Sequence, residues 1–185
     1  MRKMMNGLGG HKGAGGFFGG RGQQEAPTEP QEPVTTPVET TYSDDVVAEL
    51  LFLMEEEKLA GDVYEAFYDL YGIKIFDNIA ASEDRHFAAL EAQAEALGID
   101  MDEFVFSEPG SFENEELQAL YDSLIESGSA SVTDALNVGV AIEEKDIIDL
   151  AAAAASVEGT ALADVYQNLL TGSEYHLEAF NVLLG

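Results

Sequence analysis

Cysteine is absent from the 185-residue sequence, and only eight residues are lysine or arginine. Without cysteine, disulfide frameworks, thiolate metal sites, iron–sulfur clusters and cysteine nucleophiles are all excluded. Long hydrophobic runs are also missing: none approaches the length needed to span a bilayer, and glycine interrupts the basic N-terminus before a signal-peptide core could form. The lack of a clear signal peptide and of a transmembrane run favours a cytoplasmic location.

The scarcity of basic residues gives a formal net charge of −28. Residues 1–41 hold four basic and four acidic residues, which leaves four basic and 32 acidic residues in 42–185. A surface this acidic repels nucleic acid phosphates and anionic lipids, so general binding to nucleic acid or to a membrane surface is excluded. Metal cations remain as partners that such a surface attracts.

The composition changes abruptly near residue 41. The stretch GLGGHKGAGGFFGGRG is rich in glycine, and EAPTEPQEPVTTPVETT is rich in proline, glutamate and threonine, which is typical of disordered tails and linkers. From residue 42 onward the hydrophobic spacing is helical nearly throughout, without strand signals. The sequence therefore predicts a disordered tail over 1–41 and one helical domain over 42–185.

Capping residues and periodicity predict four long helices and one short helix in that domain. The first begins after Ser43 and ends at Gly72, and the others cover about 75–97, 114–128, 132–155 and 160–184. Short loops join the first two long helices and the last two, so each pair should form an antiparallel hairpin. More than thirty residues separate the hairpins. The expected fold is an all-α four-helix bundle whose long crossover carries the short extra helix.

The stretch ASEDRHFAAL places Glu83 and His86 three positions apart, so both lie on one face of a helix. The same row is otherwise apolar, with Ile79 before them and Leu90 after them. A buried carboxylate without a partner is energetically costly, and coordination of a metal offsets that cost. One Glu-x-x-His occurs by chance in many helices, and a hydrogen-bonded core pair without metal is the competing interpretation.

The first helix offers a second acidic residue on an apolar row. Glu57 follows Leu53 and precedes Gly61 at helical spacing, and the small residue leaves room beside the carboxylate. Tyr64 shares this face and could hydrogen-bond a carboxylate or a hydroxide in the core. It is therefore a candidate for a supporting role beside metal ligands.

The two hairpins repeat a pattern. EEKLAGD (56–62) matches EEKDIID (143–149), and SEDRHFAAL (82–90) matches GSEYHLEAF (172–180). The alignment pairs Glu57 with Glu144 and His86 with His176. Glu143 lies on a neighbouring apolar row and remains the alternative to Glu144.

These motifs resemble a known group of proteins. A glutamate on each of two helices and Glu-x-x-His on each of the other two is the signature of di-iron and di-manganese carboxylate bundles. EEEKLAGDVY, SEDRHF, ALNVGVAIEEKDIIDL and VYQNLLTGSEYHLEAF resemble the rubrerythrin group of the ferritin-like superfamily, and most closely a prokaryotic family known only as a domain of unknown function. The resemblance covers 42–185 and implies a ferritin-like bundle. The metal ligands that it implies are Glu57, Glu83, His86, Glu144 and His176.

One position departs from the signature. Ser173 stands three residues before His176, where a glutamate is expected. Glu174 is adjacent but points about 100° away around the helix. It is a lesser candidate that a bulge near Gly172, which is also a possible kink, would have to swing inward.

The resemblance implies a di-iron or di-manganese oxidoreductase that acts on dioxygen or peroxide, with zinc as another ion that the ligands suit. Electrons would come from a separate donor, because the chain has no cysteine for an iron–sulfur or rubredoxin-like centre. Two alternatives are a non-catalytic metal storage protein and a metal-free bundle that binds a partner. The sequence leaves the oligomeric state open.

Overall fold

The structure, a computed structural model, describes residues 41–101 and 108–185. Almost all of the predicted tail, 1–41, lies outside these residues. The described residues form five α-helices and no strand, which confirms the all-helical prediction. The helices are α1 (Asp44–Tyr71), α2 (Lys74–Ala96), α3 (Glu115–Gly128), α4 (Val132–Ser156) and α5 (Ala161–Leu184).

Local capping sets the helix boundaries. The side chains of Ser43, Ser131 and Thr160 each accept a hydrogen bond from a backbone N–H in the first turn of α1, α4 and α5. At the end of α1, Gly72 adopts φ 67°, a left-handed conformation that glycine reaches without the steric penalty of a side chain. The long helices therefore begin and end close to where the sequence predicts.

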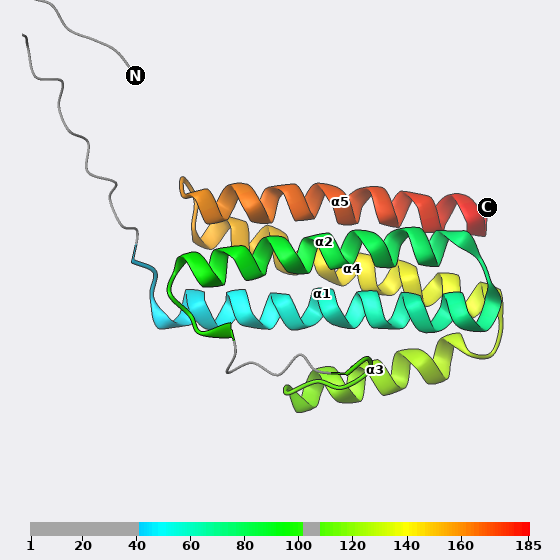
Figure 1. Ribbon diagram of the computed structural model, residues 1–185. Coiled ribbons are helices and arrows are strands. Elements are labelled where there is room, and N and C mark those ends of the chain that lie inside the picture. The colour runs from blue at the N-terminus through cyan, green and yellow to red at the C-terminus, as the bar shows by residue number, and fades with distance from the viewer. Residues whose placement is uncertain (1–40, 102–107) are drawn as a thin grey trace, which may run out of the picture. The chain divides into compact units, whose positions relative to one another are not determined.

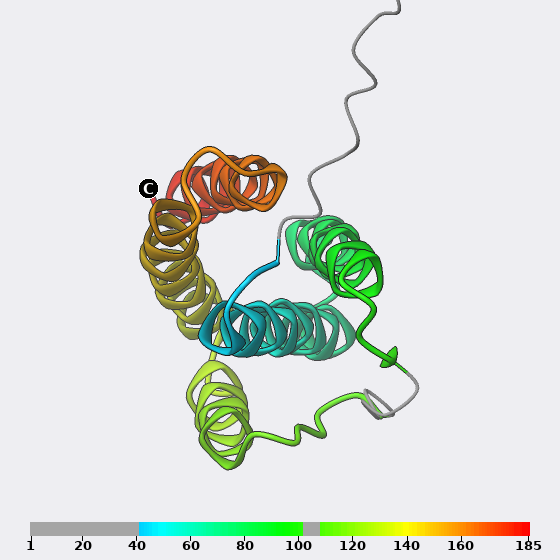
Figure 2. The same ribbon diagram turned by 90° about the vertical axis from the view of Figure 1, so that its left-hand side faces the viewer.

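The helices pack as two hairpins, α1 with α2 and α4 with α5, which lie against each other through α1 and α4 and through α2 and α5. Figure 1 shows the four long helices side by side, and the view along them in Figure 2 places α3 outside this group, against α1 and α4. In the described residues, no helix is long and apolar enough to cross a membrane.

The core has two apolar clusters, one in each half of the bundle. One is built around Tyr64, Phe67, Phe76 and Phe180, and the other contains Leu50, Met54, Leu90, Leu150 and Tyr166. Along every long helix, buried acidic residues or histidines lie between the residues of one cluster and those of the other. The bundle is therefore an apolar core with a polar layer near its middle.

The end of the crossover is tied to α1. Asp62 Oδ2 accepts a hydrogen bond from the Gly110 backbone N–H at 2.8 Å, and Glu55 Oε1 accepts one from the Glu113 N–H at 2.6 Å. Lys58 forms an ion pair with Asp62 at 2.6 Å. These contacts hold the segment before α3 against the helix that carries Glu57.

Candidate metal centre

The polar layer brings together five side chains from all four long helices. Glu57 comes from α1, Glu83 and His86 from α2, Glu143 from α4 and His176 from α5. The three carboxylates are at most 2% exposed, and both imidazoles are 11% exposed at the side chain. They form two triads that share Glu83, and in each triad one ligand atom per residue lies within 4.8 Å of the others.

The shared carboxylate lies between the two imidazoles. Glu83 Oε2 is 2.7 Å from His86 Nδ1, and Glu83 Oε1 is 2.8 Å from His176 Nδ1. Glu57 Oε2 lies 3.1 Å from His86 Nδ1, and Glu143 Oε2 lies 3.5 Å from His176 Nδ1. Each histidine therefore faces two carboxylates, one of which is Glu83.

Several of these buried atoms lack a hydrogen bond despite their short contacts. Both oxygens of Glu83, Oε2 of Glu143 and Nδ1 of His176 have no partner with hydrogen-bond geometry. Buried polar atoms are nearly always paired, so such orphaned atoms need an explanation. Carboxylate oxygens and imidazole nitrogens that converge in a buried layer without well-formed hydrogen bonds are arranged as ligands of a cation. The residues thus fit a metal site of oxygen and nitrogen donors.

Protons would have to balance the charge of this cluster without a metal. Burial raises the pKa of Glu57 to about 8 even though His86 opposes the shift. For Glu83, burial is outweighed by His176 and His86, which lower its pKa to about 2. Burial disfavours the imidazolium forms, but the contacts with glutamates prevail and raise the pKa of His86 to about 10 and of His176 to about 9. Without a metal, the contacts with the glutamates therefore favour the protonated imidazoles, and burial favours the protonated form of Glu57.

Tyr64 supports one of the carboxylates. Its hydroxyl donates a hydrogen bond to Glu143 Oε1 at 2.7 Å in the buried core. Burial and the charge of Glu143 raise the pKa of Tyr64 well above its ordinary value, so the phenol keeps its proton and remains a donor. The bond occupies Oε1 and leaves Oε2 of Glu143 facing His176.

Gly172 provides the space for His86. A Cβ atom at this position would lie 2.5 Å from Nε2 of His86, so any side chain there would displace the imidazole. The rings of His86 and His176 stack with centroids 5.5 Å apart. The expected kink is not observed, because α5 is one continuous α-helix from Ala161 to Leu184. The glycine allows close packing of α2 against α5.

The structure places the neighbouring residues Glu143 and Glu144 in different surroundings. Glu143 is fully buried beside His176, whereas Glu144 is exposed and lies outside the cluster. One residue corresponds to about 100° around a helix, so only one of the two neighbours can face the core. The buried face of α4 runs through Ile142, Glu143 and Asp146. The structure therefore brings Glu143 into the cluster and leaves Glu144, which the alignment favours, outside it.

The last helix, α5, contributes no carboxylate to the cluster. Glu174 is exposed, and α5 has no bulge that would turn it inward. Ser173 is fully buried, and its hydroxyl donates a long hydrogen bond, 3.4 Å, to the Leu169 carbonyl oxygen. The lesser candidate Glu174 is therefore not part of the cluster.

Asp146 is an acidic residue of this layer that the sequence did not single out. It is 5% exposed, lies one turn after Glu143 on α4, and its Oδ2 atom has no hydrogen-bond partner. Burial first, and then the charges of Glu57, Glu143 and Glu83, raise its pKa well above the ordinary value. The spacing of three residues after Glu143 is the signal that identifies it once Glu143 is known to face inward.

Residues 47–184 match the family described as "Uncharacterized protein domain (DUF2202)". The chain belongs to this family. The DUF2202 match contains all five residues of the cluster, and it confirms the predicted resemblance to a domain of unknown function.

The chain is similar to "Uncharacterized protein MJ0754" of Methanocaldococcus jannaschii, with 40% identity over 131 residues that cover 71% of this chain and 70% of the relative. It is also similar to the solved structure described as "Crystal structure of hypothetical protein MJ0754 from Methanococcus jannaschii DSM 2661". That likeness has a TM-score of 0.75 at 35% identity and covers 81% of this chain and 85% of the other. The chain thus shares its fold with this relative.

Proposed function

We propose that this DUF2202 protein is a ferritin-like metal-binding protein whose buried cluster holds two iron or two manganese ions and acts as an oxidoreductase on dioxygen or peroxide. The observation that carries the proposal is the position of Glu83. Both of its oxygens lie within 2.8 Å of a histidine nitrogen, in two different triads, and neither has a hydrogen bond. A carboxylate that faces two donor sets is suited to bridge two cations.

The ligands divide between two ions. Glu57 and His86 would hold one ion, Glu143 and His176 would hold the other, and Glu83 would bind both. Carboxylate and imidazole donors suit iron and manganese, and zinc is another ion that they accept. The two metal ions would supply redox chemistry and Lewis acidity.

The chain's own residues prepare this site in two ways. Tyr64 fixes the orientation of Glu143 through its hydrogen bond of 2.7 Å. The two apolar clusters on either side of the polar layer restrict the access of water from the ends of the bundle. The chain carries no cysteine, so the reductant would be a separate electron donor.

Metal analysis tests the proposal most directly. Metal-free protein is reconstituted with ferrous iron under anaerobic conditions and desalted, and its metal content is measured by mass spectrometry. About two equivalents are expected, and His86→Ala or His176→Ala should each lower that number. Wild-type protein that retains no stoichiometric metal would contradict the proposal.

Turnover separates the oxidoreductase from a storage protein. With a reductant present, the iron-loaded protein should consume many equivalents of peroxide per chain. Zinc-loaded protein is the control, because Zn²⁺ has no redox chemistry and should consume none. Consumption that stops after one or two equivalents would favour metal storage over catalysis.

A further inference from the structure

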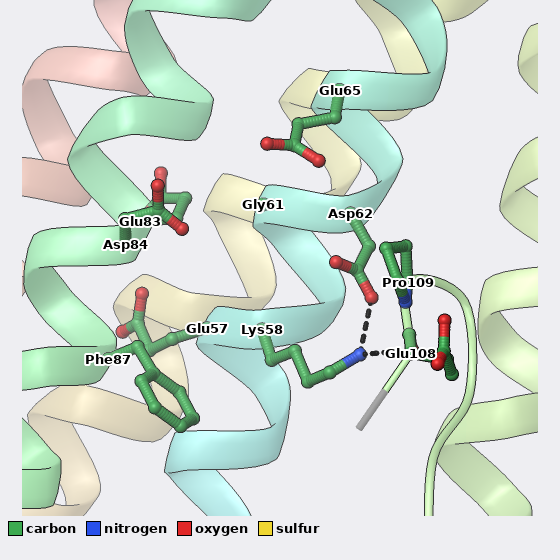
Figure 3. A pocket seen from close by; sticks show the side chains of 10 residues that line it. All are labelled: Glu57, Lys58, Gly61, Asp62, Glu65, Glu83, Asp84, Phe87, Glu108 and Pro109. Carbon is green, nitrogen blue, oxygen red and sulfur yellow. Dashed lines mark hydrogen bonds and ion pairs between the residues drawn. The ribbon is translucent and has the colours of Figure 1, made fainter. Parts of the chain in front are cut away.

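A cavity of about 250 Å³ opens beside the cluster, and its inner end is formed by Glu57 and Glu83. Figure 3 shows these two carboxylates on one side of the cavity and the pair of Lys58 and Asp62 on the other. Gly61 lies between them on α1, where the lack of a side chain leaves the space open. We call this cavity the vestibule.

The outer part of the vestibule is acidic. Glu65 on α1 and Asp84 on α2 line it, and both are exposed. The same two residues line a second cavity of about 300 Å³, which continues along α1 and α2 past Asp69 and Asp77. Burial and the charges of Asp84 and Asp62 raise the pKa of Glu65, so these carboxylates lie close enough to repel one another.

The positive charge in the vestibule is already engaged. Lys58 Nζ forms an ion pair with Asp62 at 2.6 Å and donates hydrogen bonds to the carbonyl oxygens of Glu108 and Ser111 at 3.1 and 3.3 Å. Within residues 41–101 and 108–185, no lysine or arginine forms an ion pair with Glu65 or Asp84. Their charges are therefore free to attract a cation from solvent.

An acidic surface alone does not define a site, but the vestibule ends on two deeply buried carboxylates. Glu83 is 1% exposed and both of its oxygens lack a hydrogen-bond partner, while Glu57 is 2% exposed. We infer that the vestibule captures divalent metal ions from solvent through Glu65 and Asp84 and delivers them to Glu57 and Glu83. This inference rests on the proposed metal centre. It identifies the seam of α1 and α2 as the route to that centre.

The kinetics of metal loading test this route. Metal-free wild type and the variant Glu65→Gln/Asp84→Asn are mixed with Co²⁺ at low ionic strength, and the visible absorbance of bound cobalt is followed by stopped flow. The matched control is Glu95→Gln/Glu126→Gln, which removes the same charge from two exposed residues outside the vestibule. Because electrostatic steering is worth about 10-fold or more in association rate, the vestibule variant should load roughly 10-fold more slowly than the control. Both variants should reach the wild-type stoichiometry at equilibrium.

Salt and charge reversal give independent measurements. Added salt screens exposed charges, so the difference between the two variants should shrink as ionic strength rises. Glu65→Lys/Asp84→Lys should load still more slowly than the neutral variant, and circular dichroism verifies that each variant is folded. Equal loading rates for the vestibule and control variants, with normal stoichiometry, would overturn the inference alone. Wild-type protein that binds no cobalt would overturn the metal centre as well.

Discussion

The two hairpins are built on one plan but contribute unequally to the cluster. In each, a helix with a buried glutamate is followed by a helix with a buried histidine. The α1–α2 hairpin provides Glu57, Glu83 and His86, whereas the α4–α5 hairpin provides only Glu143 and His176. The difference lies at the position three residues before each histidine, which is Glu83 in α2 and a serine in α5.

This inequality explains the central place of Glu83. Because α5 has no carboxylate at the matching position, Glu83 is the only carboxylate in both triads of the described residues. Both histidines approach it more closely than they approach any other carboxylate in the cluster. We therefore expect the two halves of the site to depend on one residue of the first hairpin.

The largest effect should come from exchanging that residue. Glu83→Gln keeps the size of the side chain but removes its charge and one of its two carboxylate oxygens. Residues outside the coordination sphere are worth about 10–100-fold in metal affinity, so the loss of a shared ligand should lower affinity by more than about 100-fold. Equilibrium dialysis against iron or cobalt measures this change.

The matched position in the second hairpin is the control for this experiment. Ser173 has a single long hydrogen bond within its own helix, so Ser173→Ala should leave metal content unchanged. Retention of both ions by Glu83→Gln would show that the two halves of the site do not share this carboxylate.

A second comparison uses one glycine from each hairpin. A Cβ at Gly172 would meet His86 Nε2 at 2.5 Å, whereas a Cβ at Gly61 would meet Glu83 Cβ at an ordinary 3.6 Å. Overpacking lowers stability by about 1–3 kcal/mol. Replacing a helical glycine by alanine raises stability by about 0.5–1 kcal/mol. Gly172→Ala should therefore destabilise the fold and lower metal content.

Gly61→Ala is the matched test, and it should leave stability unchanged or raise it by up to about 1 kcal/mol. Urea unfolding of the metal-free variants measures both changes. If Gly172→Ala proved as stable as Gly61→Ala and kept full metal content, the close approach of α5 to His86 would not matter for the site.

Much of the fold and part of the cluster could be predicted from the sequence. Ser43, Ser131 and Gly72 carry their signals in the sequence itself, because a cap depends on a residue and its next few neighbours. Glu83 and His86 could be placed on an inward face because the row that contains them is otherwise apolar. Local spacing is sufficient for features of this kind.

The structure also shows why the alignment points to Glu144 although Glu143 lies in the cluster. The alignment of EEKLAGD with EEKDIID matches Lys58 with Lys145, and each lysine does form an ion pair with the aspartate four residues later. The repeat therefore aligns these ion pairs, whereas the cluster glutamates are offset by one residue. Glu57 immediately precedes its lysine, and Glu143 lies two residues before its lysine. Gly172 owes its role to packing between helices, which local spacing does not encode. Asp146 can be found by spacing only once Glu143 is known to face inward.

The pH dependence should differ between the metal-free and metal-loaded states. The pKa values of His86 and His176 rise from 6.5 to about 10 and about 9 on folding, and that of Glu57 rises from 4.5 to about 8. Between the unfolded and folded values, the folded protein binds more protons than the unfolded chain, so its stability falls as pH rises. For the histidines this loss begins above pH 6.5 and is complete near pH 10.

Metal ions replace these protons, so metal binding should release protons. The affinity for metal should therefore rise with pH over the same range. The measurement is the thermal midpoint of metal-free and metal-loaded protein from pH 6.5 to 9.5, with proton release followed by a pH indicator. The midpoint of the metal-free protein should fall while that of the loaded protein changes less. Parallel curves would mean that the histidines do not hold protons in the metal-free fold.

The smallest effect concerns the repeated ion pairs. Lys58 and Asp62 are 12% and 13% exposed, whereas Lys145 and Asp149 are 42% and 30% exposed. Asp62 also accepts the hydrogen bond from Gly110 that holds the crossover against α1. Exposed pairs contribute about 0–1 kcal/mol, so Asp149→Asn should cost about 0.5 kcal/mol or less and Asp62→Asn about 1 kcal/mol.

The remaining partners of each lysine strengthen this expectation. Without Asp149, Lys145 keeps its ion pair with Glu56. Without the charge of Asp62, Lys58 keeps only carbonyl oxygens, and the crossover loses a charged anchor beside the vestibule. Urea unfolding of both variants in 0.1 M and 1 M salt measures the difference, which should persist at high salt because the Asp62 pair is shielded from solvent. Equal costs for the two substitutions would show that the crossover contributes no stability through Asp62, and that the two motifs are equivalent in energy as well as in sequence.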